Sequence, residues 1–293
     1  MGVFSQVLMT VDFDRTLTGP DGKIPQANLK AIDRFMHDGG AFTVNTGRSL
    51  PMLRPELSRF PVNAPLLLYN GSVAYDWAEK KMIFSHPIDL NPSEVLPRIQ
   101  AQFPDLLLGV QGLEAHYIFR HEPLWQVFGR ENGCEVREIC FAQLPSPFLK
   151  MALYGTIRDG TVSQFYEITP EQDAGFQEAE RWLQERYGAS LSVTRGAPRI
   201  LDLQAAGTSK GQAARELARQ LGRQPGAGLP QGEAIPLADA RPALFVGRAH
   251  QPDGVAVFFK GRAHDDRAVH EEEGLSPALR LVGGGQHAGN DLR

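Results

Sequence analysis

The chain has 293 residues, more than one compact domain usually holds, so its length predicts two domains or one domain with a large insertion. A hydrophobic fraction of 42% can supply a sizeable core, and the formal net charge is only -4. The Lys and Arg residues are scattered along the chain, which argues against nucleic acid as the main partner but leaves a small anionic substrate open.

Apolar runs alternate with helical patterns in the first part of the chain. Residues 7–11 form an apolar run that leads straight into Asp12, which predicts a buried strand rather than a signal peptide. Residues 27–37 carry apolar side chains at helical spacing and precede Gly39 and Gly40, which is typical of a helix end. Further strands are predicted at 41–44 and 66–69, and a helix at 51–60. This alternation predicts a parallel sheet covered on both faces.

The pattern changes after Asn70 and Gly71. Residues 73–75 and 82–84 predict a hairpin, and beyond it short β-like runs alternate with helices. The runs are 115–120, 148–157 and 199–203, and the helices are 93–103 and 170–187. We interpret residues 72–202 as an α+β unit inserted into an α/β core of Rossmann-like topology, which comprises residues 1–71 and 203–293.

An amphipathic helix is predicted at residues 208–221, with Gly222 at the stop position. Beyond Gly222 the chain becomes rich in Gly, Ala, Pro, Arg and His and loses clear periodicity. In this last part, strands are predicted only at 243–247, 255–259 and 279–282.

Two carboxylates, Asp12 and Asp14, follow the first predicted strand. Ligands in open α/β sheets bind at this carboxyl edge, where alternate side chains project to the same side. Such oxygen ligands suit Mg²⁺, which would keep a nucleophile ionised. One Asp can attack phosphorus to give an aspartyl-phosphate, while the other protonates the leaving alcohol and then activates water. The alternative interpretation is a solvated turn with incidental acids.

The second predicted strand also ends in polar residues, Thr46, Gly47 and Arg48. A hydroxyl and backbone N–H groups in this position can bind phosphate oxygens, and Gly47 lets the backbone approach closely. Arg48 has two open interpretations, orienting the substrate or capping the following segment. Asn70, after the third strand, is either a substrate contact or part of a plain turn.

Lys210 stands at the start of the predicted helix 208–221. Helix N-terminal N–H groups and a lysine supply fixed positive potential where phosphoryl charge must be stabilised. A lysine at a helix start is, in isolation, usually a solvated residue. From the residues alone, both interpretations of Lys210, a phosphate ligand and a solvated residue, stay open.

These segments resemble the motifs of a known enzyme family. Asp12, Asp14 and Thr16 after an apolar strand are similar to the first motif, Asp-x-Asp-x-Thr, of the haloacid dehalogenase-like (HAD) phosphatases. Residues 46–48 resemble the second motif in the form that is characteristic of the Cof-type subgroup, whose members resemble sugar phosphatases. Residues 209–211 resemble the third motif.

The resemblance implies roles for individual residues. Asp12 would be the nucleophile and Asp14 the acid/base, with Mg²⁺ bound by the Asp12 carboxylate and the Asp14 backbone carbonyl. Thr46 and Lys210 would hold the phosphate, and the inserted unit would be a cap that closes over the site. Many members have Gly where this chain has Arg15, which indicates a change in loop conformation or in local charge.

The fourth motif of the family is not recognisable. Relatives carry one or two acids in it, typically Gly-Asp-x-x-Asn-Asp after a strand, which complete the Mg²⁺ shell. The candidate acids in this chain are Asp239, Asp253, Asp265, Asp266 and Asp291. The composition shift after Gly222 motivates the hypothesis that the C-terminal reading frame was altered. Translating the coding DNA in all three frames tests it, and finding no such acidic segment discards it.

We therefore predict a Mg²⁺-dependent HAD-type hydrolase that cleaves a small phosphomonoester, with a sugar phosphate as one candidate. The alternatives are a phosphotransferase or phosphomutase of the same superfamily, or a catalytically impaired phosphate-binding or regulatory homologue. No segment approaches the ~20 apolar residues that a membrane span needs. Cys134 and Cys140 do not indicate a disulfide framework, so a cytoplasmic location is expected. The sequence does not indicate the oligomeric state.

Overall fold

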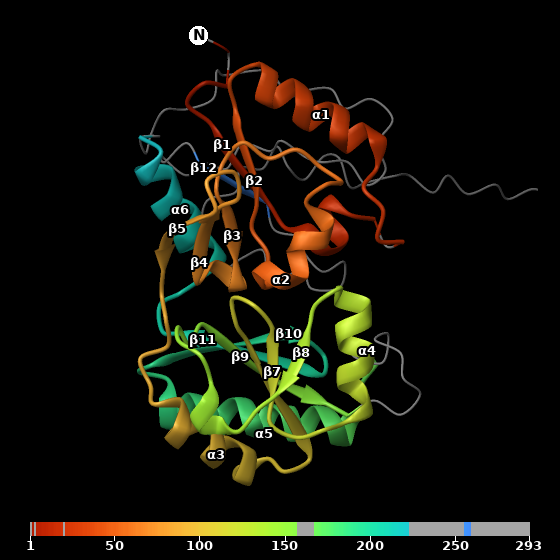
Figure 1. Cartoon of the computed structure of the whole chain (residues 1–293), viewed down its shortest axis with the longest axis vertical. Helices are drawn as coiled ribbons and strands as arrows, with labels where there is room; N and C mark the ends of the chain where they lie inside the picture. Colours follow the sequence, from red (N-terminus) through yellow and green to blue (C-terminus); the bar gives the residue numbers. More distant parts are fainter. Residues whose placement is uncertain (1, 3, 20, 157–166, 223–254, 259–293) are drawn as a thin grey trace, which may run out of the picture.

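The structure, a computed structural model, describes residues 2, 4–19, 21–156, 167–222 and 255–258. Figure 1 shows its elements in two groups. The core group contains strands β1 to β5 and β12 with helices α1, α2 and α6, and the inserted group contains strands β6 to β11 with helices α3 to α5. One sheet is parallel and another is mixed, which confirms the predicted α/β class.

A parallel sheet of order β12-β1-β2 forms the centre of the core group. All residues of β1 and β2 are buried, as expected for apolar strands covered on both faces. Their register places Val11 opposite Val44, so both strands end at the same edge. The bounds are β1 Leu8–Val11, α1 Gln26–His37, β2 Ala41–Val44 and β12 Val255–Phe258. These elements lie close to the predicted positions.

Strand β3 (Leu66–Leu68) extends this arrangement, because a parallel bridge joins Asn45 to Leu67. The predicted hairpin is confirmed as β4 (Val73–Asp76) and β5 (Lys81–Ser85), and it pairs with β3 in an antiparallel sheet. Helix α6 (Lys210–Gln220) packs its buried residues Ala213, Ala214, Leu217 and Ala218 against these strands. The helix predicted at 208–221 is thereby confirmed.

The helix predicted at 51–60 is shorter in the structure. Helix α2 spans Leu50–Leu53 and passes into a 3-10 turn at Arg54–Glu56. Ser49 caps its start by accepting a hydrogen bond from the Met52 N–H. Pro55 has no backbone N–H to continue the helical ladder, which explains the early end.

The inserted group is built on a six-stranded sheet of order β10-β11-β9-β6-β7-β8. All its pairs are antiparallel except β7 with β8. Apolar side chains on one face pack against α3 and α5, while α4 covers part of the face turned toward the core group (Figure 1). The bounds are α3 Pro92–Gln102, β6 Leu106–Gln111, β7 His116–Ile118, α4 Pro123–Asn132, β8 Val136–Glu138, β9 Lys150–Gly155, α5 Pro170–Tyr187, β10 Leu191–Ala197 and β11 Ile200–Ala205. Helix α4 and strands β6, β8 and β10 had not been predicted.

Two connections join the inserted group to the core group, and they lie next to each other. Residues 85–87 and 205–209 line one cavity of about 630 Å³, together with residues of α6. His86 in the outgoing connection lies 2.9 Å from the Glu216 carboxylate on α6. The division into domains at residues 72 and 202 stays a prediction. In the structure, the β4–β5 hairpin follows residue 72 but pairs with β3, which precedes that residue.

Several predictions fall outside the described residues. These are the strands at 243–247 and 279–282 and the candidate acids Asp239, Asp253, Asp265, Asp266 and Asp291. Among the helices that the structure describes, none combines the length and apolar character that crossing a membrane requires.

Candidate active site

Asp12 and Lys210 meet at the carboxyl end of β1. The Lys210 Nζ lies 2.8 Å from Asp12 Oδ1, although the two residues come from opposite ends of the described chain. Lys210 is the first residue of α6, whose start is fixed because the Asn45 side chain donates to the Lys210 carbonyl over 2.8 Å. Both side chains keep about a quarter of their surface exposed, 24% for Asp12 and 22% for Lys210. The predicted convergence of these two residues is therefore present in the geometry.

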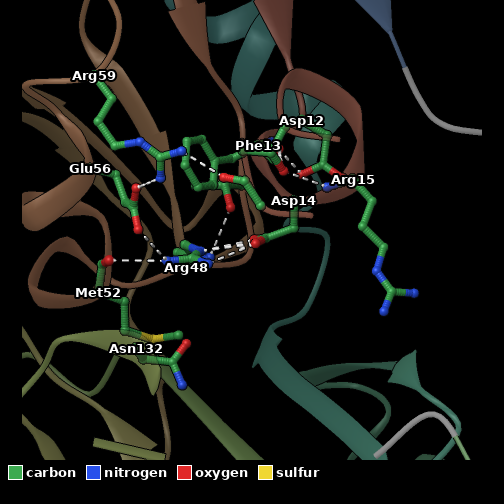
Figure 2. Close-up of polar contacts among 12 residues, drawn as sticks. Asp12, Phe13, Asp14, Arg15, Arg48, Met52, Glu56, Arg59 and Asn132 are labelled. Carbon is green, nitrogen blue, oxygen red and sulfur yellow. Dashed lines mark hydrogen bonds and ion pairs between the residues drawn. The ribbon is translucent and has the colours of Figure 1, made fainter. Parts of the chain in front are cut away.

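Asp14 lies in a tight turn that follows Asp12. The Thr18 hydroxyl closes the turn, because it accepts from the Arg15 N–H over 3.0 Å and donates to the Phe13 carbonyl over 3.1 Å. Arg15 takes a left-handed conformation with φ 58°, which glycine adopts at lower cost. The turn therefore has a backbone conformation at Arg15 that suits glycine, and the charged Arg15 side chain points away from Asp12 and Asp14 (Figure 2).

Arg48 holds the Asp14 carboxylate. Its Nη2 and Nε donate to Asp14 over 2.8 and 3.0 Å, and its Nη1 donates to the Met52 carbonyl over 3.3 Å (Figure 2). The guanidinium also lies 4.9 Å from the centre of the Phe13 ring, within the range of a cation–π contact. Of the two interpretations of Arg48, the bond to Met52 fits capping of α2, whereas contact with a substrate stays a prediction.

The loop that carries Thr46 is fixed from several sides. The Thr46 N–H donates to the Leu67 carbonyl over 2.9 Å, and the Thr46 carbonyl accepts from the Asn70 N–H over 3.0 Å. The Thr46 side chain is fully buried, and its Oγ1 accepts from the Arg48 N–H over 3.1 Å. A Cβ on Gly47 would lie 2.7 Å from Asn70 Oδ1, so the close approach predicted for Gly47 is made toward a side chain.

Asn70 links the two groups of elements. It has a left-handed conformation with φ 57°, and its Nδ2 donates to Asp202 Oδ2 over 3.0 Å and to Gln204 Oε1 over 3.3 Å. Both acceptors lie on β11 of the inserted group. The amide thus contributes to docking of the inserted group, and its predicted contact with a substrate stays a prediction.

Lys150 and Asp202 form an ion pair that the motifs did not reveal. Lys150 Nζ lies 3.0 Å from Asp202 Oδ2 and also donates to the Gly47 carbonyl over 3.0 Å. The signal in the sequence is a charged residue in each of two otherwise uncharged, mostly apolar strands, β9 and β11. Two charges inside apolar strands indicate that they compensate each other across the sheet.

Two buried ionisable groups, His116 on β7 and Tyr69 after β3, lie on the two sides of the contact between the groups. Burial and the nearby Lys150 lower the pKa of His116 to about 3, so the imidazole is neutral at pH 7. Its ring lies 4.4 Å from Phe128 and 5.3 Å from Trp125, centre to centre. Burial also raises the pKa of Tyr69, whose hydroxyl donates to the Gly112 carbonyl over 2.8 Å. These residues seal the contact between the two groups.

The oxygen atoms around Asp12 fit a hard divalent cation. Asp12 caps the turn Phe13–Leu17 and Asp14 lies within it, so two carboxylate residues follow β1 directly, and Mg²⁺ commonly uses only one or two carboxylates together with water and substrate phosphate. Within the described part of the chain, no cluster of three or more His, Cys, Asp or Glu residues has metal-binding geometry. The third acid expected from the family has its candidates among residues outside that part.

Comparisons with known proteins agree with the motifs. The family model of the haloacid dehalogenase-like hydrolases matches residues 9–226. A haloacid dehalogenase-like hydrolase from Bacteroides thetaiotaomicron has a TM-score of 0.60 at 20% identity, over 74% of this chain and 78% of that protein. One from B. subtilis has a TM-score of 0.57 at 18% identity, over 73% and 79%. A HAD subclass IIB sugar phosphatase has a TM-score of 0.56 at 15% identity, over 74% and 76%.

The similarity to these solved structures shows the fold, while the family model matches the sequence itself. The match begins in β1 and ends near Gly222, where the sequence pattern had lost its resemblance. The prediction of a HAD-type hydrolase is confirmed by this match. The chain belongs to the family of haloacid dehalogenase-like hydrolases.

Proposed function

We propose that this protein is a Mg²⁺-dependent phosphatase that hydrolyses a small phosphomonoester through an aspartyl-phosphate on Asp12. The observation that carries the proposal is the 2.8 Å contact between Lys210 Nζ and Asp12 Oδ1 at the end of β1. An ammonium beside a carboxylate nucleophile can hold an oxygen of the phosphoryl group that the carboxylate attacks. The family match supports a hydrolase, and the fold shared with a sugar phosphatase makes a sugar phosphate one candidate substrate.

The residues divide the reaction between them. An Asp12 oxygen attacks phosphorus as the phosphorus–oxygen bond to the substrate breaks, and Asp14 gives a proton to the leaving alcohol. Asp14 then takes a proton from water as the water attacks the aspartyl-phosphate, which releases inorganic phosphate and restores Asp12. Arg48 fixes the orientation of the Asp14 carboxylate, because its Nε donates to both carboxylate oxygens and its Nη2 donates to Oδ1.

The phosphate itself is proposed to bind Lys210, the Thr46 hydroxyl and the N–H groups at the start of α6. Helix N-termini and lysines both favour an anion. Mg²⁺, when held by the Asp12 carboxylate and the Asp14 carbonyl, would neutralise charge on the phosphate oxygens. The inserted group is proposed to act as a cap that limits access of water and contacts the organic part of the substrate.

The test is hydrolysis of a generic aryl phosphate by the purified protein, with and without Mg²⁺. Asp12→Asn is expected to lower kcat by at least about 10³-fold, because the amide is not a nucleophile. Its melting temperature should stay close to the parental one, since the partner Lys210 remains partly in solvent. Parental activity that survives in Asp12→Asn contradicts the proposed mechanism.

Two outcomes distinguish the alternatives. Transfer of phosphate to an added alcohol in preference to water indicates a phosphotransferase. A well-folded parent protein that binds inorganic phosphate without hydrolysing any phosphomonoester indicates the impaired, phosphate-binding homologue. A panel of sugar phosphates compared by kcat/KM tests the substrate class, and the cytoplasmic location stays a prediction.

A further inference from the structure

We propose that Lys150 is a positioning residue of the phosphate site. From the inserted group, it holds the peptide unit between Gly47 and Arg48, and through this unit it sets the Thr46 hydroxyl. The inference rests on the proposed role of Thr46 as a phosphate ligand, and it adds a residue that lies outside the motifs.

The two hydrogen bonds are made by a single rigid unit. Lys150 Nζ donates to the Gly47 carbonyl over 3.0 Å, and the Arg48 N–H donates to Thr46 Oγ1 over 3.1 Å. The carbonyl and the N–H belong to one planar peptide, so fixing the first orients the second. Because Thr46 Oγ1 already accepts this N–H, its own proton is left for another acceptor, and a phosphate oxygen would reach it only by displacing the atoms that bury Thr46 in this structure.

The surroundings of Lys150 keep its ammonium in place. The whole residue is 2% exposed, and the register pairs it with Gln204, which puts Asp202 diagonally across on the same face. Asp202 binds both the Lys150 ammonium and the Asn70 amide over 3.0 Å. Apolar residues at two buried positions usually stabilise a protein as well as an ion pair does, which favours a role for this pair beyond stability.

Lys150 therefore couples docking of the inserted group to the geometry of the loop that holds Thr46. When β9 and β11 lie against the core group, the ammonium reaches Gly47 and the loop has one conformation. When the inserted group moves away, the Gly47 carbonyl loses this donor, and the Thr46 hydroxyl loses its fixed direction.

The test uses the full chain with Lys150→Met combined with Asp202→Asn. The double variant removes both charges at once, so that no unpaired buried charge destabilises the fold, and it retains an oxygen at position 202 for Asn70. Arg195→Met is the control, because Arg195 pairs with Asp173 over 3.3 Å entirely within the inserted group. Three quantities are measured in each protein: melting temperature, kinetics on an aryl phosphate with inorganic phosphate as inhibitor, and hydrogen exchange of the peptide containing residues 45–49.

The double variant is expected to lose about tenfold or more in kcat, since small displacements of a positioning group cost this much. Inorganic phosphate should inhibit it several-fold more weakly, and the Arg48 amide should exchange faster, while amides of β1 exchange at the parental rate. Arg195→Met should change none of these. Parental kinetics together with unchanged Arg48 exchange in the double variant overturn the inference. A parent without hydrolase activity refutes the proposed function instead, and the exchange rates then decide the inference alone.

Discussion

Two Lys–Asp pairs of this protein have nearly the same length and very different surroundings. Lys210 and Asp12 are 2.8 Å apart with side chains 22% and 24% exposed, whereas Lys150 and Asp202 are 3.0 Å apart with side chains 3% and 11% exposed. The open pair can exchange its partner for an incoming anion, since water and ligands reach both groups. The sealed pair cannot, so its ammonium can act only on protein atoms such as the Gly47 carbonyl. Exposure, more than chemistry, distinguishes Lys210, the proposed phosphate ligand, from Lys150.

The largest expected effects come from removing each lysine separately. Lys210→Met should lower activity by about 10²–10³-fold while changing the free energy of unfolding by no more than about 1 kcal/mol. Lys150→Met should lower the free energy of unfolding by about 3–5 kcal/mol, because Asp202 is left buried without its counter-ion. Urea titrations and aryl phosphate hydrolysis measure both. Equal destabilisation by the two variants would contradict the comparison.

Lowering the pH should reduce the free energy of unfolding through the buried His116. Its pKa is about 3 in the folded protein against 6.5 in the unfolded chain, so the unfolded chain binds more protons below pH 6.5. Stability should therefore fall as the pH drops from 6.5 toward 3, by at most about 4 kcal/mol from this residue. His116→Leu should flatten that part of the curve of unfolding free energy against pH. A variant with the parental slope contradicts this assignment.

A methyl group at Gly47 should disturb the contact between the two groups. Its Cβ would lie 2.7 Å from Asn70 Oδ1, which must move and weaken its bonds to β11. Gly47→Ala is expected to lower stability by about 1–2 kcal/mol and kcat by roughly tenfold. Gly175→Ala is the matched control, because its Cβ meets no atom within 4 Å and lies in α5. The control should be slightly stabilised, by about 0.5–1 kcal/mol.

The smallest effect on stability is expected at Arg15, in the turn that follows Asp12. Arg15 has φ 58°, a conformation that costs an ordinary residue about 1–2 kcal/mol and costs glycine little. Arg15→Gly should raise the free energy of unfolding by up to about 1 kcal/mol, since the greater freedom of glycine in the unfolded chain offsets part of the gain. Thermal unfolding measures it, and a lower melting temperature would show that the Arg15 side chain stabilises the loop.

The sequence predicted the parts of this protein in which short segments carry their own signal. Residues 7–11 and 41–44 are apolar strands that end in polar residues, and the helix that begins at Lys210 has a regular apolar stripe, so all were placed correctly. The helix predicted at 51–60 is too long because its apolar pattern continues past Pro55, which has no backbone N–H to extend α2. Strand β10 escaped prediction because its alternation of exposed and buried residues is irregular at a bulge between Arg195 and Ala197.

Only part of the candidate site could be predicted from the sequence. Asp12 and Lys210 were expected to meet because both stand at ends of elements that share one edge of a sheet. Lys150 and Asp202 depend on the register between β9 and β11 and on how the inserted group sits against Gly47. Neither the register of distant strands nor the docking of two groups is encoded in a local pattern, so these residues became visible only in three dimensions.

The two neighbouring connections have a consequence for how such a chain can diversify. The segment that carries β6 to β11 leaves after residue 86 and returns before Ser209, beside the same helix and the same cavity. An insertion whose ends adjoin adds little strain to its host and can be exchanged as a whole. If Asp12 and Lys210 have the proposed roles, both can be kept while the segment that carries β6 to β11 is replaced, and a new organic group can be accepted without a change in the residues that carry the chemistry.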